Sequence, residues 1–310
     1  MKRLKKPLAL LLSAALLLLA AAPVFAAQTA DGALPFENSA FFETGAYRIH
    51  YRTFPAENET GRVFMIHGFA LSSYCFVMLA ERLAAAGYTC VLADLPDFGY
   101  STRETADMAL LPREDIMHEL MVSLSGDPWF VAGHSMGGYV ALALAEKYPE
   151  SVKNLLLYGT NGNEGNGAAK GVMTNPVFLN IMGPVMETLG KSKPLVRLLY
   201  AAACNSFPFA LSYDVSKITD PYYIKGTGVG AILNFSMLPA TDYEAVKTMP
   251  SILFLNGDSD KVIADGTRGN LRAALPYGSW DIVIPGAGHM VIETHADVTA
   301  AYTLRFLADK

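Results

Sequence analysis

The sequence predicts an α/β fold, a mostly parallel β-sheet with helices on both faces and a helical segment inserted before its last strands. Three observations predict it. Short continuous apolar runs alternate with stretches of helical period along most of the chain, which is typical of doubly wound parallel sheets. Glycine or proline closes several of these runs. The alternation is interrupted once, between residues 161 and 249, and then resumes.

Composition excludes several classes of protein. The chain has 310 residues, of which 52% are hydrophobic and 17% charged, so it is too apolar to be disordered. Its net charge is −5 and it has no long basic run beyond the extreme N-terminus, so we do not expect a nucleic-acid partner. Three cysteines, Cys75, Cys90 and Cys204, cannot all pair and lack C-x-x-C spacing, which argues against a disulfide scaffold and a zinc site.

The N-terminus has the pattern of a secretory signal peptide. A basic cluster at residues 2–6 precedes an apolar run from Leu8 to Ala22, and small residues follow around Ala26. We therefore expect residues 1–26 to be removed near Ala26, giving a secreted or periplasmic protein without stable membrane insertion. An uncleaved anchor is the alternative, although a membrane span usually needs about 18 or more apolar residues.

The expected elements follow in order. Residues 27–160 form the first part of the core. In it, 27–45 show no clear period and are expected to be an extended entry segment. Strands are expected at 47–54, 62–66, 88–93, 129–132 and 152–158, and helices at 74–86, 114–124 and 136–148. Residues 161–249, punctuated by prolines and rich in Met, Phe, Tyr and Leu, are expected to form an inserted helical subdomain. Residues 250–310 complete the core with strands at 252–255 and 280–284 and a helix from about 290 to 307.

A G-x-S-x-G motif, Gly133-His134-Ser135-Met136-Gly137, stands between an expected strand and an expected helix. Glycines permit the tight strand-to-helix turn that exposes a serine hydroxyl at a helix N-terminus, where the helix dipole favours developing negative charge. Ser135 is therefore the candidate nucleophile. The alternative is that Ser135 merely caps the helix.

A serine nucleophile needs a base, and the chain has six histidines. His289 lies in a glycine-rich loop after the last expected strand, on the same sheet edge as Ser135, and is the candidate base. The other five are expected to be structural, solvent-facing or supports of the local backbone: His50, His67, His118, His134 and His295.

The acid that orients the base should also follow a strand at this edge. Asp258 and Asp260 both follow the strand at 252–255, and either could serve. Asp258 could instead stabilise the turn through its own backbone. Asp94, after another strand, is a more distant candidate that we expect to brace a loop.

The motifs and their order resemble the α/β-hydrolase superfamily over residues 47–310. The matching segments are His67-Gly68-Phe69, Asp94 to Ser101, Gly133 to Gly138, Gly257-Asp258-Ser259-Asp260 and Gly288-His289. The resemblance implies that Asp260 is the acid and that the backbone N–H groups of Phe69 and Met136 form the oxyanion hole. It also implies that residues 161–249 are the family's helical cap, and that neither a cofactor nor a metal is required.

The resulting hypothesis is an exported serine hydrolase that acts on a small-molecule ester, lactone or related acyl compound. Ser135 occupies the position where related dehalogenases and epoxide hydrolases carry an aspartate, which disfavours those reactions. A C–C bond hydrolase, a cofactor-free haloperoxidase or perhydrolase, and a non-catalytic ligand-binding protein on the same fold stay as alternatives. Oligomeric state is left open.

Overall fold

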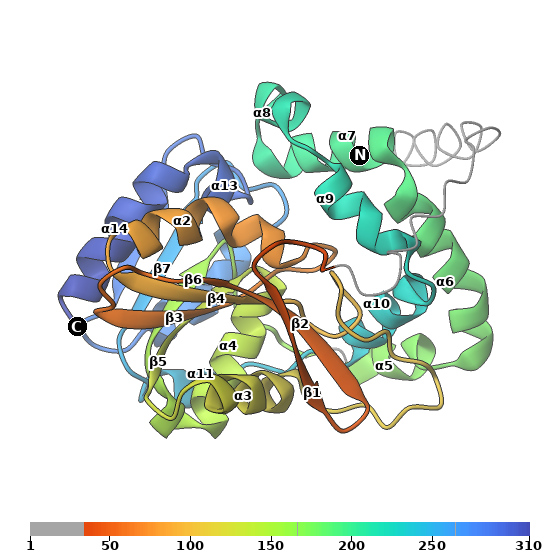
Figure 1. Ribbon diagram of the computed structural model, residues 1–310, viewed down its shortest axis with the longest axis horizontal. Helices are drawn as coiled ribbons and strands as arrows, with labels where there is room; N and C mark the ends of the chain where they lie inside the picture. The colour runs from red at the N-terminus through yellow and green to blue at the C-terminus, as the bar shows by residue number, and fades with distance from the viewer. Residues whose placement is uncertain (1–33, 166, 264) are drawn as a thin grey trace, which may run out of the picture.

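The computed structural model describes residues 34–165, 167–263 and 265–310, so the predicted signal peptide at 1–26 lies outside the described residues. An eight-stranded sheet runs through the centre in the order β1-β2-β4-β3-β5-β6-β7-β8 (Figure 1). Strand β2 pairs antiparallel with β1 and β4, and every other neighbouring pair is parallel. The strands are β1 Ser39–Thr44, β2 Tyr47–Phe54, β3 Gly61–Ile66, β4 Tyr88–Ala93, β5 Trp129–His134, β6 Val152–Tyr158, β7 Ile252–Gly257 and β8 Trp280–Ile284.

Helices cover both faces of this sheet. The strand β3 shows why its sequence is a continuous apolar run: Phe64 and Ile66 belong to one core cluster, whereas Val63 and Met65 belong to the cluster on the opposite face. The first cluster includes residues of α3 (Arg113–Leu124), α4 (Met136–Lys147) and α12 (Gly269–Ala274). The second includes residues of α2 (Val77–Ala85), α13 (Val291–Thr294) and α14 (Ala296–Ala308).

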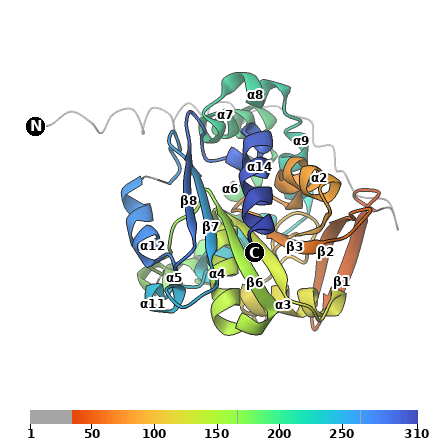
Figure 2. The ribbon, with the colours of Figure 1, turned by 90° about the vertical axis from the view of Figure 1, so that its left-hand side faces the viewer.

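The insertion between β6 and β7 is helical. Figure 1 shows α6 and α10 beside the sheet, and Figure 2 shows α7 and α8 above it, with β1 and β8 toward opposite edges. In the part of the chain that the structure describes, no helix is long and apolar enough to cross a membrane. The helices of the insertion are α5 Gly167–Met173, α6 Pro176–Lys191, α7 Lys193–Cys204, α8 Phe207–Ser212, α9 Ser216–Thr219, α10 Thr227–Ser236 and α11 Tyr243–Val246.

Buried charges fix the loop that follows β4. The guanidinium of Arg113 lies 2.5 Å from Glu104 Oε2 and 3.3 Å from Asp97 Oδ2, and all three side chains are fully buried. Burial, together with the charge of Glu104, raises the pKa of Asp97 to about 8. The same loop carries Phe98, whose ring packs edge-on against Phe69 at 5.5 Å between centroids. The loop therefore supports the residue expected to supply an oxyanion donor.

The fold class is confirmed, including every strand that the sequence predicts. Three details differ. Residues 39–44, expected to be an irregular entry segment, form the edge strand β1; the adjacent Phe41 and Phe42 interrupt the alternation that marks a strand. The expected final helix is split at His295, whose φ of −128° and ψ of 39° are not helical. The short helix α12 was not expected.

Candidate active site

Ser135 stands at the turn between β5 and α4 with φ 52° and ψ −121°, a backbone conformation that residues with a Cβ rarely adopt. Hydrogen bonds on both sides hold this strained turn. The Ser135 N–H donates to the Tyr158 carbonyl at 3.0 Å, and the Ser135 carbonyl accepts from Gly138 N–H at 2.9 Å and from Thr160 Oγ1 at 2.7 Å. Strain of this kind concentrates at functional sites.

The glycines around Ser135 have a steric function. A Cβ on Gly137 would lie 2.1 Å from the carbonyl oxygen of Ile66, and a Cβ on Gly133 would lie 2.5 Å from the carbonyl oxygen of Gly137. The start of α4 can therefore lie close to both β3 and β5 only because these side chains are absent. This is the tight turn that the G-x-S-x-G pattern predicts.

His289 lies in the loop after β8, and its backbone is held from two sides. Its N–H donates to the carbonyl of Ala203 in α7 at 2.7 Å, and its carbonyl lies 3.0 Å from His134 Nε2. Its Nδ1 is 3.0 Å from Asp260 Oδ2, and 7% of its side chain is exposed. Burial, followed by the charge of His289, lowers the pKa of His134 to about 3, so His134 stays neutral beside the candidate base.

The structure pairs His289 with Asp260 rather than with Asp258. Asp260 Oδ1 accepts from the N–H groups of Val262 and Ile263 at 2.8 and 3.0 Å, and its side chain is fully buried. Burial opposes its ionisation, but the hydrogen bond and charge of His289 and these two N–H groups outweigh burial and lower its pKa.

The side chain of Asp258 supports a turn, although it does so through the neighbouring loop and the Ser259 side chain rather than through its own backbone. Its Oδ1 accepts from the Gly286 N–H at 2.8 Å and lies 2.9 Å from Ser259 Oγ, so it braces the turn between the β7 and β8 loops.

The two candidate oxyanion donors flank the same turn. Met136 is the first residue of α4, where backbone N–H groups have no partner within the helix. Phe69 follows Gly68, which passes so close to the turn that a Cβ on it would lie 3.0 Å from Ser135 Cβ. His67 supports this segment, because its Nε2 accepts from the Leu95 N–H at 3.0 Å.

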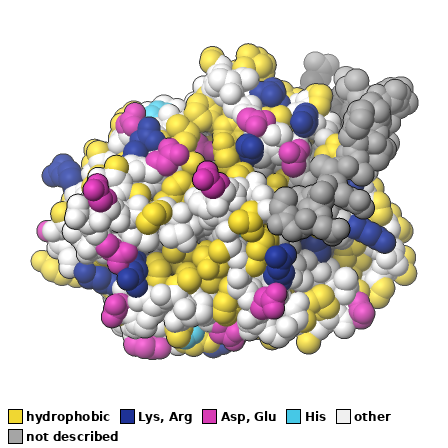
Figure 3. Space-filling view, in the orientation of Figure 1, with side chains coloured by type: hydrophobic (Ala, Val, Ile, Leu, Met, Phe, Trp, Pro, Cys, Tyr) yellow, Lys and Arg dark blue, Asp and Glu magenta, His cyan; other side chains and the backbone are white. Residues whose placement is uncertain are grey.

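Ser135 and His289 line a cavity of about 420 Å³ between the core loops and the insertion. Its insertion side is formed by apolar residues of α6, α7 and α9 and by two tyrosines: Met186, Leu189, Gly190, Leu195, Val196, Leu199, Tyr200, Ala203, Ile218 and Tyr222. Leu199 is also 60% exposed, so the cavity opens to the surface there. Phe207 and Leu211 on the nearby helix α8 are exposed to solvent. Figure 3 shows hydrophobic side chains at the top of the molecule, over this part of the insertion.

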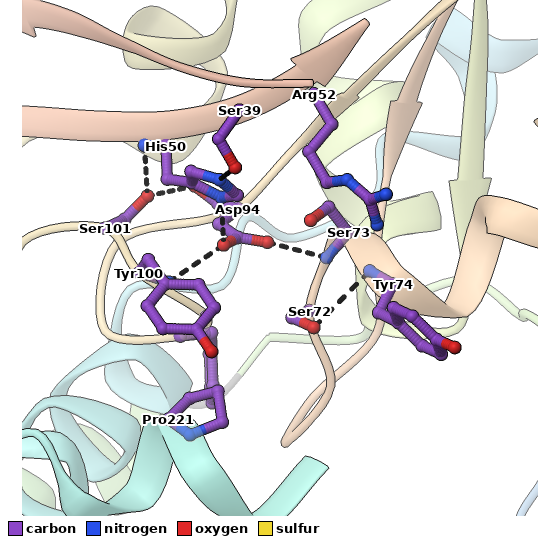
Figure 4. A network of polar contacts seen from close by, with 12 residues as sticks. Ser39, His50, Arg52, Ser72, Ser73, Tyr74, Asp94, Tyr100, Ser101 and Pro221 are labelled. Atoms are coloured by element: carbon purple, nitrogen blue, oxygen red, sulfur yellow. Dashed lines mark hydrogen bonds and ion pairs between the residues drawn. The ribbon is translucent and has the colours of Figure 1, made fainter. Parts of the chain in front are cut away.

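A second Ser–His–Asp constellation lies elsewhere in the core (Figure 4). Ser39 Oγ is 2.7 Å from His50 Nε2, and His50 Nδ1 is 2.7 Å from Asp94 Oδ2. Asp94 also accepts from the N–H groups of Ser73 and Tyr100 at 2.6 and 2.8 Å. All three members are buried, and Ser39 lies within the edge strand β1, away from the cavity that Ser135 lines. This network ties β1 and β2 to the loop after β4, as expected for His50 and Asp94.

The remaining histidines make local contacts. His118 stacks on the ring of Tyr148, and His295 Nδ1 lies 3.0 Å from Thr294 Oγ1. Within the described ranges, no group of three or more His, Cys, Asp or Glu side chains is arranged to hold a metal ion.

One residue at the site was not anticipated. Arg268 contacts Asp260 Oδ2 at 2.5 Å, and 1% of its side chain is exposed. Nothing in the local sequence sets this arginine apart from the others, because its partner is determined by how the connection between β7 and α12 folds.

Comparison with known proteins places the chain in a family. Residues 61–296 match the model of the α/β hydrolase fold, so the chain belongs to the α/β-hydrolase fold family. Lipase 1 of Psychrobacter immobilis is 26% identical over 247 residues, which cover 77% of this chain and 74% of that protein. Lipase 3 of Moraxella sp. (strain TA144) is 34% identical over 132 residues, 40% of this chain and 41% of that protein, so the chain spans less than half of that relative.

Solved structures agree on the fold. The enol-lactonase from Burkholderia xenovorans LB400 superposes with a TM-score of 0.70 over 87% of this chain and 100% of that chain. Their sequence identity is 16%, so this likeness concerns the fold alone.

The two aspartates after β7 should respond differently to the same change. Asp260→Asn should lower kcat by about 10³–10⁴-fold, because an amide no longer fixes the imidazole tautomer. Asp258→Asn should keep near-full activity, because its amide oxygen can still accept from Gly286. Steady-state kinetics on a soluble ester would measure both, with circular dichroism to verify folding. Near-full activity in Asp260→Asn together with loss in Asp258→Asn would reverse the assignment.

Proposed function

We propose that this protein is a serine hydrolase that cleaves a carboxylic ester, lactone or related acyl compound with an apolar acyl group. The observation that carries the proposal is the shared cavity: Ser135, on its strained turn, and His289, paired with Asp260, both open into one apolar space. The distant similarity to lipases supports the same class of substrate.

In the proposed mechanism, Ser135 Oγ attacks the acyl carbonyl carbon while His289 Nε2 accepts its proton. Asp260 holds the Nδ1–H of His289, which leaves Nε2 free as the base and stabilises the imidazolium that forms. The N–H groups of Phe69 and Met136 donate to the oxyanion of the tetrahedral intermediate. His289 then gives the proton to the leaving group, and afterwards activates the water that hydrolyses the acyl-enzyme.

Covalent labelling tests the nucleophile and uses the second constellation as its control. A fluorophosphonate probe should label the wild-type protein and Ser39→Ala, and should not label Ser135→Ala. Ser39 contacts a His–Asp pair directly, and Ser135 shares a cavity with one, so this comparison isolates the effect of position in the fold. A folded wild-type protein that the probe leaves unlabelled would favour the non-catalytic ligand-binding alternative.

The apolar wall that α6 and α7 contribute should select the acyl group. Leu195 lines the cavity, whereas Leu198 on the same helix is 55% exposed and does not. Burial of the acyl chain of a substrate in this wall would stabilise binding by about 0.8 kcal/mol per CH₂. Leu195→Asn should therefore lower kcat/KM for an octanoyl ester about tenfold more than for an acetyl ester, and Leu198→Asn should change neither. Equal losses on both esters in folded Leu195→Asn would remove this wall from the acyl site.

We also propose that the protein is exported and that its signal peptide is cleaved near Ala26, on the pattern of the first 26 residues. Intact mass spectrometry of protein recovered outside the cytoplasm should show a chain that begins close to Ala27. A chain that keeps residues 1–26 and sediments with membranes would instead establish an anchored protein.

A further inference from the structure

Arg268 and Arg113 are the two largest fully buried side chains of the described residues. Arg113 contacts two carboxylates, Asp97 and Glu104, in the loop after β4. Arg268, the last residue of the short helix at Asp265–Arg268, reaches the carboxylate that contacts the candidate base. A guanidinium is costly to bury unless a carboxylate partner compensates its charge. Asp260 is such a partner for Arg268, so the buried arginine acts directly on the carboxylate that contacts His289.

The contact involves one particular oxygen. Asp260 Oδ2 lies 2.5 Å from Arg268 Nη2 and 3.0 Å from His289 Nδ1, so the arginine and the imidazole share it. The other oxygen accepts from the N–H groups of Val262 and Ile263. Four donors thus surround the carboxylate, and one of them belongs to a permanently charged group.

We propose that Arg268 is a positioning residue of the acid–base pair, which fixes the Asp260 carboxylate and offsets part of its negative field at His289. A carboxylate next to an imidazole favours the protonated imidazolium, and a cation on the same carboxylate weakens that effect. Arg268 therefore keeps His289 neutral, and able to act as a base, at lower pH than Asp260 alone would allow. This inference rests on the proposed function, since it assigns Arg268 a part in the Ser135 chemistry.

Several charged or titratable groups of the described residues surround the loop that carries His289. Glu293 of α13 accepts from the Tyr200 hydroxyl, and burial raises its pKa to about 8, whereas Lys261 Nζ lies 3.0 Å from Asn205 Oδ1. Asp260 and Arg268 lie on its Nδ1 side, and the ring of His134 lies 4.9 Å away between centroids. The cavity adds Tyr200 and Tyr222, and burial raises the pKa of both phenols and keeps them neutral. His134 is also neutral, and of the described charged groups Asp260 and Arg268 are the ones that the hydrogen bonds place at the Nδ1 of His289.

The test is the pH dependence of kcat/KM on a butyrate ester between pH 4.5 and 8, whose acid limb reports protonation of the base. In Arg268→Gln the cation is gone, the imidazolium is favoured, and the limb should move to higher pH by about one unit. Arg268→Lys keeps the charge but loses the planar fork, so its limb should stay within about 0.2 unit while kcat falls. Arg272→Gln, which breaks a partly exposed pair with Asp281, is the matched control and should leave the profile unchanged.

A purely structural Arg268 would lower kcat in both variants at every pH without moving the limb, and this result would overturn the inference. Circular dichroism verifies each variant. If Arg268→Gln does not fold, Arg268→Met removes the same charge with an apolar side chain that can stay buried, and an unmoved limb in this variant overturns the inference. Ser135→Ala distinguishes failure of the proposed function from failure of the Arg268 inference. Hydrolysis that survives in Ser135→Ala refutes the proposed function. If Ser135→Ala is inactive and the acid limb of Arg268→Gln does not move, only the role of Arg268 is refuted.

Discussion

The close crossing of α4 over β3 is the steric constraint on which the site depends. Because Gly137 has no side chain, the helix start can lie against the Ile66 carbonyl, where a Cβ would be only 2.1 Å away. That approach forces the chain to turn sharply at Ser135, which takes a positive φ and is held by Tyr158 and Thr160 at the end of β6. The hydroxyl is thereby fixed at a helix N-terminus and at the carboxyl edge of the sheet, where the loops after β7 and β8 also arrive. A larger residue at Gly137 would displace α4 and the serine together.

The two sets of Ser, His and Asp side chains differ more in their surroundings than in their contact distances. The Ser39–His50–Asp94 set has shorter contacts than the His289–Asp260 pair, yet its serine lies in an edge strand and Asp94 is occupied by backbone N–H groups of two loops (Figure 4). The Ser135 set differs in its surroundings: a strained turn, a helix start and an apolar cavity. These surroundings are the reason for proposing Ser135 rather than Ser39 as the nucleophile, because an oxyanion must have donors and a substrate must have space.

The sequence could predict the parts of this arrangement that depend on local pattern and on the geometry of parallel sheets. Apolar runs locate the strands, and since the carboxyl ends of parallel strands share an edge, Ser135, Asp260 and His289 were expected to converge. The residues alone did not decide whether Asp258 or Asp260 is the acid that orients His289. Both follow the same strand, and only the conformation of the turn determines which one reaches His289. Arg268 was missed for a related reason: its pairing is set by tertiary folding of an irregular connection. Strand β1 was missed because edge strands need no strict alternation.

The insertion is coupled to the chemistry of the core as well as to the shape of the cavity. The N–H of His289 donates to the carbonyl of Ala203 in α7, and a Cβ on Gly288 would lie 2.4 Å from that same carbonyl. One turn earlier in α7, the Tyr200 hydroxyl donates to Glu293 at 2.5 Å; burial raises the pKa of this carboxyl to about 8. The helix that forms part of the apolar wall is thus hydrogen-bonded both to the loop that carries the candidate base and to α13, the helix that follows this loop. Because α7 both lines the cavity and holds the His289 backbone, a movement of α7 that widened the cavity would also shift His289 relative to Asp260.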